Sequence, residues 1–264
     1  MSNTSEQAES APGMSSVDLV DRVRLAIAHG ELLPGQHLVE SDLAAMFGVS
    51  RGAVRSALTV LDVDGLITRT PNRGARVRPI SLAEAVEITE LRAVIEGMCA
   101  AKAAQRATAQ ERADLRCLDD RMRAAVEVGD SAAYSLLSES VHGSIRRIAS
   151  QAAAIDVLDR LRYRSVRYQF SVARLPGRPR QGAEEHSAVV RAVVAGRPDD
   201  AEREMRSHLQ SVIGALYELE TQGALYTIPV PTRPSDPAGK IPTVPTSDWT
   251  GRNAGAAIGR GELP

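Results

Sequence analysis

The chain has 264 residues, of which 43% are hydrophobic and 25% charged, as is usual for a globular protein with a buried core. Its 32 basic and 33 acidic residues leave a formal net charge of −1, which argues against a protein that binds polyanions non-specifically over its whole surface. Aromatic residues make up only 3%, which favours helices over a β-sandwich or barrel. Two cysteines without a CxxC spacing exclude a disulfide framework and predict a cytoplasmic protein, and no apolar run is long enough for a membrane span.

The two ends of the chain differ from its centre in composition. Residues 1–14 are small and polar, and we expect them to form a disordered leader. Residues 225–264 carry 7 of the 14 prolines, which are compatible neither with a helix nor with a central strand. We therefore expect a disordered tail there. Two segments of different character, 15–80 and 81–224, lie between these ends.

Residues 15–80 combine helical patterns with one hairpin pattern. The expected elements are three helices, over 17–29, 41–47 and 51–64, and two strands, over 66–70 and 75–78. Gly30 and Gly65 end the first and third helices, and Ser50 is placed to cap the third. Three helices followed by a hairpin predict a winged helix-turn-helix domain.

Residues 81–224 carry helical patterns throughout. Ser81 with Glu84, and Thr108 with Glu111, have the spacing of a capping box, in which side chain and backbone satisfy each other's free donors. Breaks rich in glycine separate six expected helices, over 82–105, 109–128, 131–149, 152–172, 183–195 and 199–222. An antiparallel bundle is the economical arrangement. The fold class is thus mainly α, an N-terminal winged helix-turn-helix followed by an all-α antiparallel helical bundle.

Positive charge gathers in one part of this nearly neutral chain. Residues 50–79 contain six arginines and only two acidic residues. Arg51 and Arg55 lie four apart on the third expected helix, so they project from one side of it, as a helix that reads guanine in the major groove requires. Arg73 and Gly74 lie at the expected tip of the wing, where a cation can enter the minor groove. The alternative is a solvated charged face with no DNA partner.

Several segments of this domain resemble the DNA-binding domain of GntR-type bacterial transcription regulators. They are residues 33–38, 43–51, 54–55, 57–58, 61, 64–67 and 73–77. The resemblance implies that operator DNA is contacted by Ser50, Arg51, Arg55, Arg73 and Gly74. This chain has Gly52 and Ala53 where Thr-Pro is usual and Ser56 where Glu is usual, so the resemblance does not predict the preferred base sequence.

Three histidines lie on the apolar faces of three different expected helices. They are His142, His186 and His208. Each buried imidazole needs a polar partner, and one shared divalent metal would serve all three. A three-histidine set with open positions suits Zn²⁺, Ni²⁺ or a similar ion. The alternative is three core histidines, each with its own hydrogen-bond partner and no metal.

Residues 81–222 resemble the FCD effector-binding domain of the FadR subfamily. The matching residues include Glu90-Leu91-Arg92, Glu185-His186 and Met205 to Leu209. The resemblance implies a metal site of one aspartate and three histidines, and a small effector that is often a carboxylate. The aspartate position is Ser138 here, so metal affinity falls unless water or an effector carboxylate fills the gap. Arg92 matches a position that faces the pocket and could clamp a carboxylate, or else it pairs on the surface with Glu96.

These features predict a ligand-responsive transcription regulator that binds a pseudo-palindromic operator as a homodimer, with repression as the family's commoner output. One alternative is a DNA-binding regulator whose effector site is degenerate, so that the bundle only dimerises. Another is a metal-dependent enzyme that uses the three histidines. Its general base would have to be Glu139 or Glu185, and neither has the spacing to share a face with the neighbouring histidine. We therefore expect no enzyme.

Overall fold

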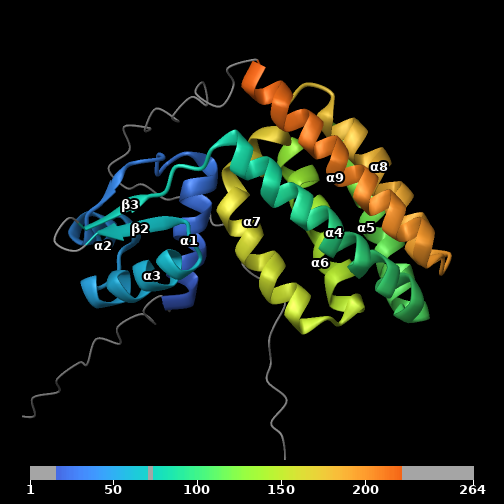
Figure 1. Cartoon of the computed structure of the whole chain (residues 1–264), viewed down its shortest axis with the longest axis horizontal. Coiled ribbons are helices and arrows are strands. Elements are labelled where there is room, and N and C mark those ends of the chain that lie inside the picture. The colour runs from blue at the N-terminus through green and yellow to red at the C-terminus, as the bar shows by residue number, and fades with distance from the viewer. Residues whose placement is uncertain (1–15, 71–73, 222–264) are drawn as a thin grey trace, which may run out of the picture. The chain divides into compact units, whose positions relative to one another are not determined.

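A computed structural model describes residues 16–70 and 74–221 of the chain (Figure 1). The N-terminal elements are α1 (Ser16–His29), β1 (His37–Leu38), α2 (Glu40–Phe47), α3 (Arg51–Val63), β2 (Ile67–Thr70) and β3 (Gly74–Val77). The later elements are α4 (Leu82–Arg106), α5 (Ala109–Glu127), α6 (Ser131–Ala149), α7 (Ala152–Val172), α8 (Arg178–Val194) and α9 (Pro198–Thr221). This confirms the predicted fold class. The expected leader at 1–14 and tail at 225–264 lie outside the described residues.

The N-terminal helices share one apolar core with a small antiparallel sheet. The strand order is β1-β3-β2, with Leu38 opposite Ala75 and Ile67 opposite Val77. The predicted hairpin is confirmed as β2 and β3, and its turn at 71–73 lies outside the described residues. The first strand was not predicted, because two residues are too short to show an alternating pattern.

Helix α3 begins at a cap and is held by one apolar face. The Ser50 hydroxyl accepts a hydrogen bond from the Ala53 amide at 3.2 Å, as predicted. Gly65 takes the left-handed conformation, with φ +72°, that lets the chain leave the helix. The buried face consists of Val54, Ala57, Leu58 and Leu61. The face that carries Arg51 and Arg55 is exposed.

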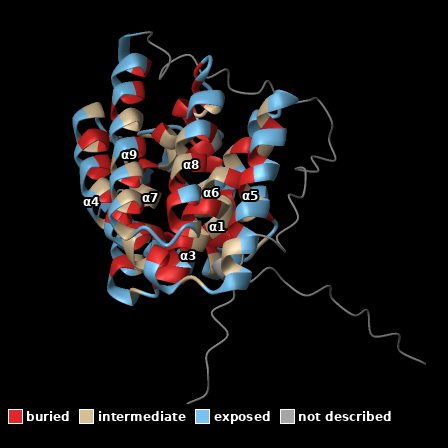
Figure 2. Cartoon of the chain, turned by 90° about the vertical axis from the view of Figure 1, so that its right-hand side faces the viewer, coloured by how far each residue is buried: buried red, intermediate tan, exposed pale blue. Residues whose placement is uncertain are grey.

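Helices α4 to α9 pack around a second apolar core (Figure 1). Helix α9 packs on α4 and α8, α5 packs on α6 and α8, and α4 also contacts α6. Each helix contributes to the core, for example through Ala100, Leu115, Val141, Leu158, Val189 and Met205. Buried residues line the faces that the helices turn toward one another, and exposed residues cover the outer faces (Figure 2). No helix of the described part is long and apolar enough to cross a bilayer.

The two predicted capping boxes differ in the structure. Thr108 and Glu111 form both reciprocal hydrogen bonds at the start of α5. At the start of α4 only half of the box forms, since Ser81 accepts from the Glu84 amide at 3.1 Å. The Glu84 carboxylate instead accepts two hydrogen bonds from Arg78, at 2.8 and 2.9 Å. A charged partner thus outcompetes the backbone amide for this side chain.

The helix predicted over 183–195 begins earlier, at Arg178. The glycines and proline of 177–182 had indicated a break over that segment, but the break between α7 and α8 lies at 173–177. Gly177, with φ +78°, lies just before the helix. Pro179 occupies the first turn, where a backbone amide would have no acceptor within the helix, so the amide proton that proline lacks is not missed. The longer helix brings Arg178 into the bundle and places Gly182 one turn before His186.

Gly182 lies against the buried Tyr134 of α6, and a Cβ at this position would overlap the Tyr134 hydroxyl. We expect Gly182→Ala to lower the free energy of unfolding by about 1–3 kcal/mol, because Tyr134 is packed and must shift. Gly214→Ala in α9 is the matched control, since nothing lies within 4 Å of its added methyl group. We expect this control to stabilise the helix by roughly 0.5–1 kcal/mol. Urea unfolding followed by circular dichroism measures both, and equal effects would contradict the predicted overlap.

Candidate functional site

The structure distinguishes the predicted DNA-contacting arginines by their partners. Arg51, in the first turn of α3, is exposed and makes no hydrogen bond or ion pair with any described residue. Arg55 pairs with Glu40 at the start of α2, with Nη2 and Oε2 2.9 Å apart. The hydrogen bond from Arg55 lowers the pKa of the Glu40 carboxyl, which therefore stays ionised. Among the described residues Arg51 is therefore unpaired, whereas Arg55 is held by Glu40.

The other arginines of this region mostly hold the hairpin and its neighbours together. Arg69 donates to the Thr59 hydroxyl at 3.1 Å, and Arg76 donates to the Gly35 carbonyl at 3.0 Å. Gly74 has φ +78°, a conformation that favours glycine at the edge of the predicted wing turn. Arg73 lies outside the described residues. The local excess of positive charge is therefore only partly free to meet a phosphate backbone.

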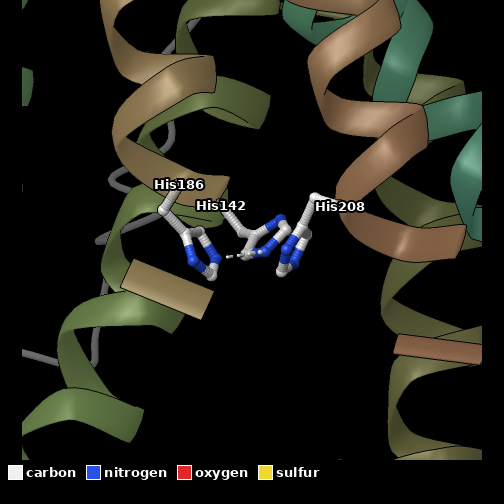
Figure 3. Close-up of side chains that lie close together, drawn as sticks. All are labelled: His142, His186 and His208. Carbon is white, nitrogen blue, oxygen red and sulfur yellow. Dashed lines mark hydrogen bonds between the residues drawn. The ribbon is translucent and has the colours of Figure 1, made fainter. Parts of the chain in front are cut away.

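The three histidines predicted to point inward meet between α6, α8 and α9 (Figure 3). Their ring centroids are 4.2–5.3 Å apart, and one ring nitrogen of each lies within 4.8 Å of the others. His142, His186 and His208 are 6%, 1% and 4% exposed. The helical periodicity had placed all three on buried faces, and the structure confirms it.

Each of the three rings is held by its Nδ1 atom. Nδ1 of His142 is 2.5 Å from Glu96, that of His186 is 2.5 Å from the Gly182 carbonyl, and that of His208 is 2.7 Å from Glu185. All three partners are acceptors, because a carbonyl or an ionised carboxylate has no proton to donate. Each Nδ1 therefore carries the proton, and in the neutral ring each Nε2 presents a lone pair. Such outer hydrogen bonds orient metal-binding imidazoles in proteins.

The Nε2 atoms face one another inside the bundle. Nε2 of His186 lies 3.1 Å from Nε2 of His142 and 3.1 Å from the Ser138 hydroxyl, which can donate to it. Two lone pairs at this distance need a proton or a metal ion between them. Burial lowers the pKa of His186 well below its usual value and that of His208 to about 4, which disfavours a second proton on either of these two rings. Nitrogens that share a tetrahedral zinc lie about 3.3 Å apart. The pair from His142 and His186 is close to this at 3.1 Å, and a ring nitrogen of His208 lies within 4.8 Å of both, so three imidazoles are near enough to serve one divalent metal.

Two carboxylates support the histidines from outside. Burial raises the pKa of Glu96, but Arg92, His142 and Arg146 together hold it well below its ordinary value. Arg92 Nε donates to Glu96 at 2.8 Å, and Arg92 is only 5% exposed. The predicted pair of Arg92 and Glu96 therefore exists, but it is buried and not on the surface. It holds the acceptor of His142 in place.

Glu185 has the same role toward His208. Arg178 donates to both of its oxygens, at 2.9 and 3.0 Å. Burial raises the pKa of Glu185, but the hydrogen bonds from His208, Arg178 and Ser211 lower it to about 2. The sequence analysis had correctly placed Glu185 away from the face of His186. Glu185 instead accepts a hydrogen bond from His208 on α9.

Sequence reasoning missed the roles of Glu96, Gly182 and Arg178. A local signal existed for the first two, since Arg92 with Glu96 and Gly182 with His186 lie one helical turn apart. The contacts of Glu96 with His142 and of Glu185 with His208 join residues 46 and 23 positions apart, and no spacing rule predicts them.

Comparisons with known proteins agree with this architecture. The model of the family described as "Bacterial regulatory proteins, gntR family" matches residues 16–77, and that of the "FCD domain" matches 87–211. The HTH-type transcriptional repressor RspR of Escherichia coli K12 is 27% identical over 202 residues, which cover 76% of this chain and 89% of RspR. An HTH-type transcriptional regulator from an unstable DNA locus of Streptomyces ambofaciens is 30% identical over 203 residues, covering 74% and 82%. The solved structure of E. coli McbR/YncC shares the fold, with a TM-score of 0.69 at 21% identity over 78% of this chain and 98% of that one.

Proposed function

The chain belongs to the gntR family of bacterial regulatory proteins and carries an FCD domain, and from this premise we propose that it is a transcriptional repressor controlled by a small molecule. Its relatives are transcription regulators, so the expectation of a regulator and not an enzyme is confirmed. The observation that carries the proposal is Arg51, an exposed guanidinium without a partner among the described residues, on a helix anchored by its opposite face. Such a group can bind guanine bidentately in the major groove.

We further propose that His142, His186 and His208 hold one Zn²⁺, Ni²⁺ or similar ion through their Nε2 atoms. When bound, the ion supplies a positive centre with open positions that can accept an effector carboxylate. Ser138 contributes no charge, so one position that an aspartate usually fills is left to water or to the effector. Glu96 and Glu185 fix two of the rings that would hold the ion, and the Gly182 carbonyl fixes the third.

The proposed homodimer would cover an exposed apolar stripe on α4. Leu91, Val94 and Met98 lie at spacings of three and four, on one side of the helix, and are 54%, 51% and 36% exposed. Contiguous apolar side chains on a surface mark an interaction site. A two-fold dimer through this stripe would present two DNA-binding domains to the two halves of a pseudo-palindromic operator.

Fluorescence anisotropy of the full chain on DNA upstream of its own gene tests the proposal. We expect binding at least about 10³-fold tighter than to scrambled DNA of equal length at one salt concentration, because direct base contacts add to the salt-dependent phosphate term. Replacing one half of the palindrome should weaken binding sharply, and sedimentation should show two chains per DNA. Equal affinity for native and scrambled DNA would contradict an operator-binding function.

A second candidate is a regulator whose bundle has lost its effector site and serves only in dimerisation. Ser138 favours it, since a neutral hydroxyl lies where the family has a charged ligand. Under this candidate neither zinc nor any small carboxylate changes the melting temperature or the DNA affinity, whereas the effector-controlled repressor responds to both.

A further inference from the structure

An ion pair joins α2 to α3, one helical turn after Arg51. Arg55 Nε donates to Oε1 of Glu40 at 3.1 Å, and Arg55 Nη2 donates to Oε2 of Glu40 at 2.9 Å. Two parallel hydrogen bonds of this kind fix the guanidinium group in one orientation, and they occupy two of its five N–H donors. The Glu40 carboxylate therefore determines where the Arg55 side chain points.

The pair contributes little to the stability of the domain. The Arg55 side chain is 64% exposed and that of Glu40 is 31% exposed, so solvent and salt screen the attraction between them. Helix α3 is anchored by its opposite, buried face, which consists of apolar residues. The main consequence of the pair is therefore for the charge that α3 presents, and not for the fold.

Glu40 cancels the charge of one arginine on the side of α3 that is predicted to meet DNA. Arg51 and Arg55 are four residues apart and project from the same side of this helix. Arg69 of β2, in contrast, donates to the neutral Thr59 hydroxyl and keeps its full positive charge. Of these three arginines, only Arg55 is paired with a carboxylate in the described part of the chain.

The Glu40 carboxylate itself lies in positive surroundings. The hydrogen bond from Arg55 is the main cause that lowers the pKa of the Glu40 carboxyl. The charges of Arg69 and Arg51 also lower it, so both of these arginines are near the carboxylate. Glu40 consequently carries a negative charge at neutral pH at the place where a DNA backbone would approach.

An unpaired Arg55 would strengthen binding to DNA of any sequence. Phosphate groups are the same on every duplex, and a flexible arginine can also reach whichever guanine is nearby. On an operator, base contacts by Arg51 fix one register, so Arg55 could use only the contacts that this register offers. On unrelated DNA the domain can choose among many registers. Since specificity is the difference between two affinities, an unpaired Arg55 would reduce it.

We propose that Glu40 is a specificity-determining residue, which holds Arg55 in an ion pair and keeps its guanidinium group away from phosphates and from guanines outside the operator. The inference rests on the proposed function, because it assumes that the chain reads an operator through Arg51. It also gives a physical reason why two arginines on one side of α3 differ, with one guanidinium group exposed and the other neutralised.

Glu40→Gln in the full chain tests this role, because glutamine keeps the size of the side chain and removes its charge. Fluorescence anisotropy on scrambled DNA and on DNA upstream of the chain's own gene measures both affinities over a series of salt concentrations. We expect the variant to bind scrambled DNA about 3- to 10-fold more tightly, because Arg55 gains a phosphate contact. The plot of log K against log salt concentration should become steeper by about 0.9 for each chain bound. The upstream DNA should gain less, so the ratio of the two affinities falls.

Two further variants separate the ion pair from net charge. Asp42 is exposed in the same turn of α2, accepts a hydrogen bond from Ser41 at 3.1 Å and pairs with no arginine of the described residues. Asp42→Asn therefore removes the same charge without releasing a guanidinium group, and we expect less than about a 2-fold change and an unaltered salt slope. Glu40→Gln combined with Arg55→Gln removes both charges of the pair and should restore the wild-type affinity for scrambled DNA. Melting curves establish that each variant is folded.

The proposal is overturned if Glu40→Gln and Asp42→Asn change the affinity for scrambled DNA equally, or if the gain persists in the double variant. It is also overturned if Glu40→Gln weakens binding to the upstream DNA and leaves scrambled DNA unchanged, since Glu40 would then orient Arg55 toward a base of the operator. Failure of the proposed function gives a different result, in which the wild type binds both DNAs equally. The salt slope on scrambled DNA would still show whether Glu40 withholds Arg55 from phosphates.

Discussion

Replacing Arg51 with alanine is expected to remove most of the sequence-selective DNA binding while leaving the fold intact. Arg51 is exposed in the first turn of α3, and no described residue competes for its guanidinium group. Losing one bidentate contact to a base should cost about 1–3 kcal/mol, or roughly 5- to 150-fold in Kd per site. A dimer loses two such contacts, so the effect on a two-half-site operator should approach the square of this factor.

Anisotropy titrations on operator and scrambled DNA at one salt concentration measure this loss. Arg55→Ala should have a smaller effect, because Arg55 is already paired with Glu40. Arg123→Ala on α5 is the control for net charge, since it removes the same charge from an exposed side chain of the helical domain. If Arg51→Ala and Arg123→Ala weaken binding equally, or if operator and scrambled DNA lose equal affinity, Arg51 does not read bases.

His186→Ala is expected to abolish stabilisation of the protein by zinc. His186 occupies the centre of the site, with its Nε2 3.1 Å from both His142 and the Ser138 hydroxyl. For the wild type, a metal concentration 100 times the Kd should add about 2.7 kcal/mol to the free energy of unfolding. Two remaining imidazoles without a carboxylate bind zinc far more weakly, so the variant should lose most of this gain.

Melting curves of chelator-treated protein, with and without added zinc, measure the effect. His37→Ala is the matched control, because His37 is an exposed histidine outside the bundle. Ser138→Asp should act in the opposite direction and tighten zinc binding by at least about 10-fold, since a carboxylate replaces a neutral hydroxyl beside His186. A zinc shift that persists in His186→Ala would place the metal elsewhere. No shift in either the wild type or Ser138→Asp would favour the regulator with a degenerate site.

Elements whose causes are local could be predicted from the sequence. The cap at Ser50 and the reciprocal pair of Thr108 and Glu111 involve neighbours within one turn, so the starts of α3 and α5 were placed correctly. The start of α8 was misplaced because its glycines and proline weaken a helix locally, while Arg178 is held by Glu185, two turns further along the same face of the helix. The strand β1 has too few residues for any pattern and exists only through its pairing with β3.

The histidine cluster and the predicted DNA-contacting arginines were likewise only partly predictable from the sequence. The helical periodicity alone predicted that the three histidines point toward the interior, since the burial of an apolar face depends on the spacing of residues along one helix. Only the packing of the helices determined that their Nε2 atoms converge, because Glu96 and Glu185 reach their histidines from other helices. Likewise, counting charges located the arginines, but the fold decided that Arg55 is paired and Arg51 is free. Local patterns depend on neighbours in the chain, whereas hydrogen-bond partners and ionisation depend on which helices meet.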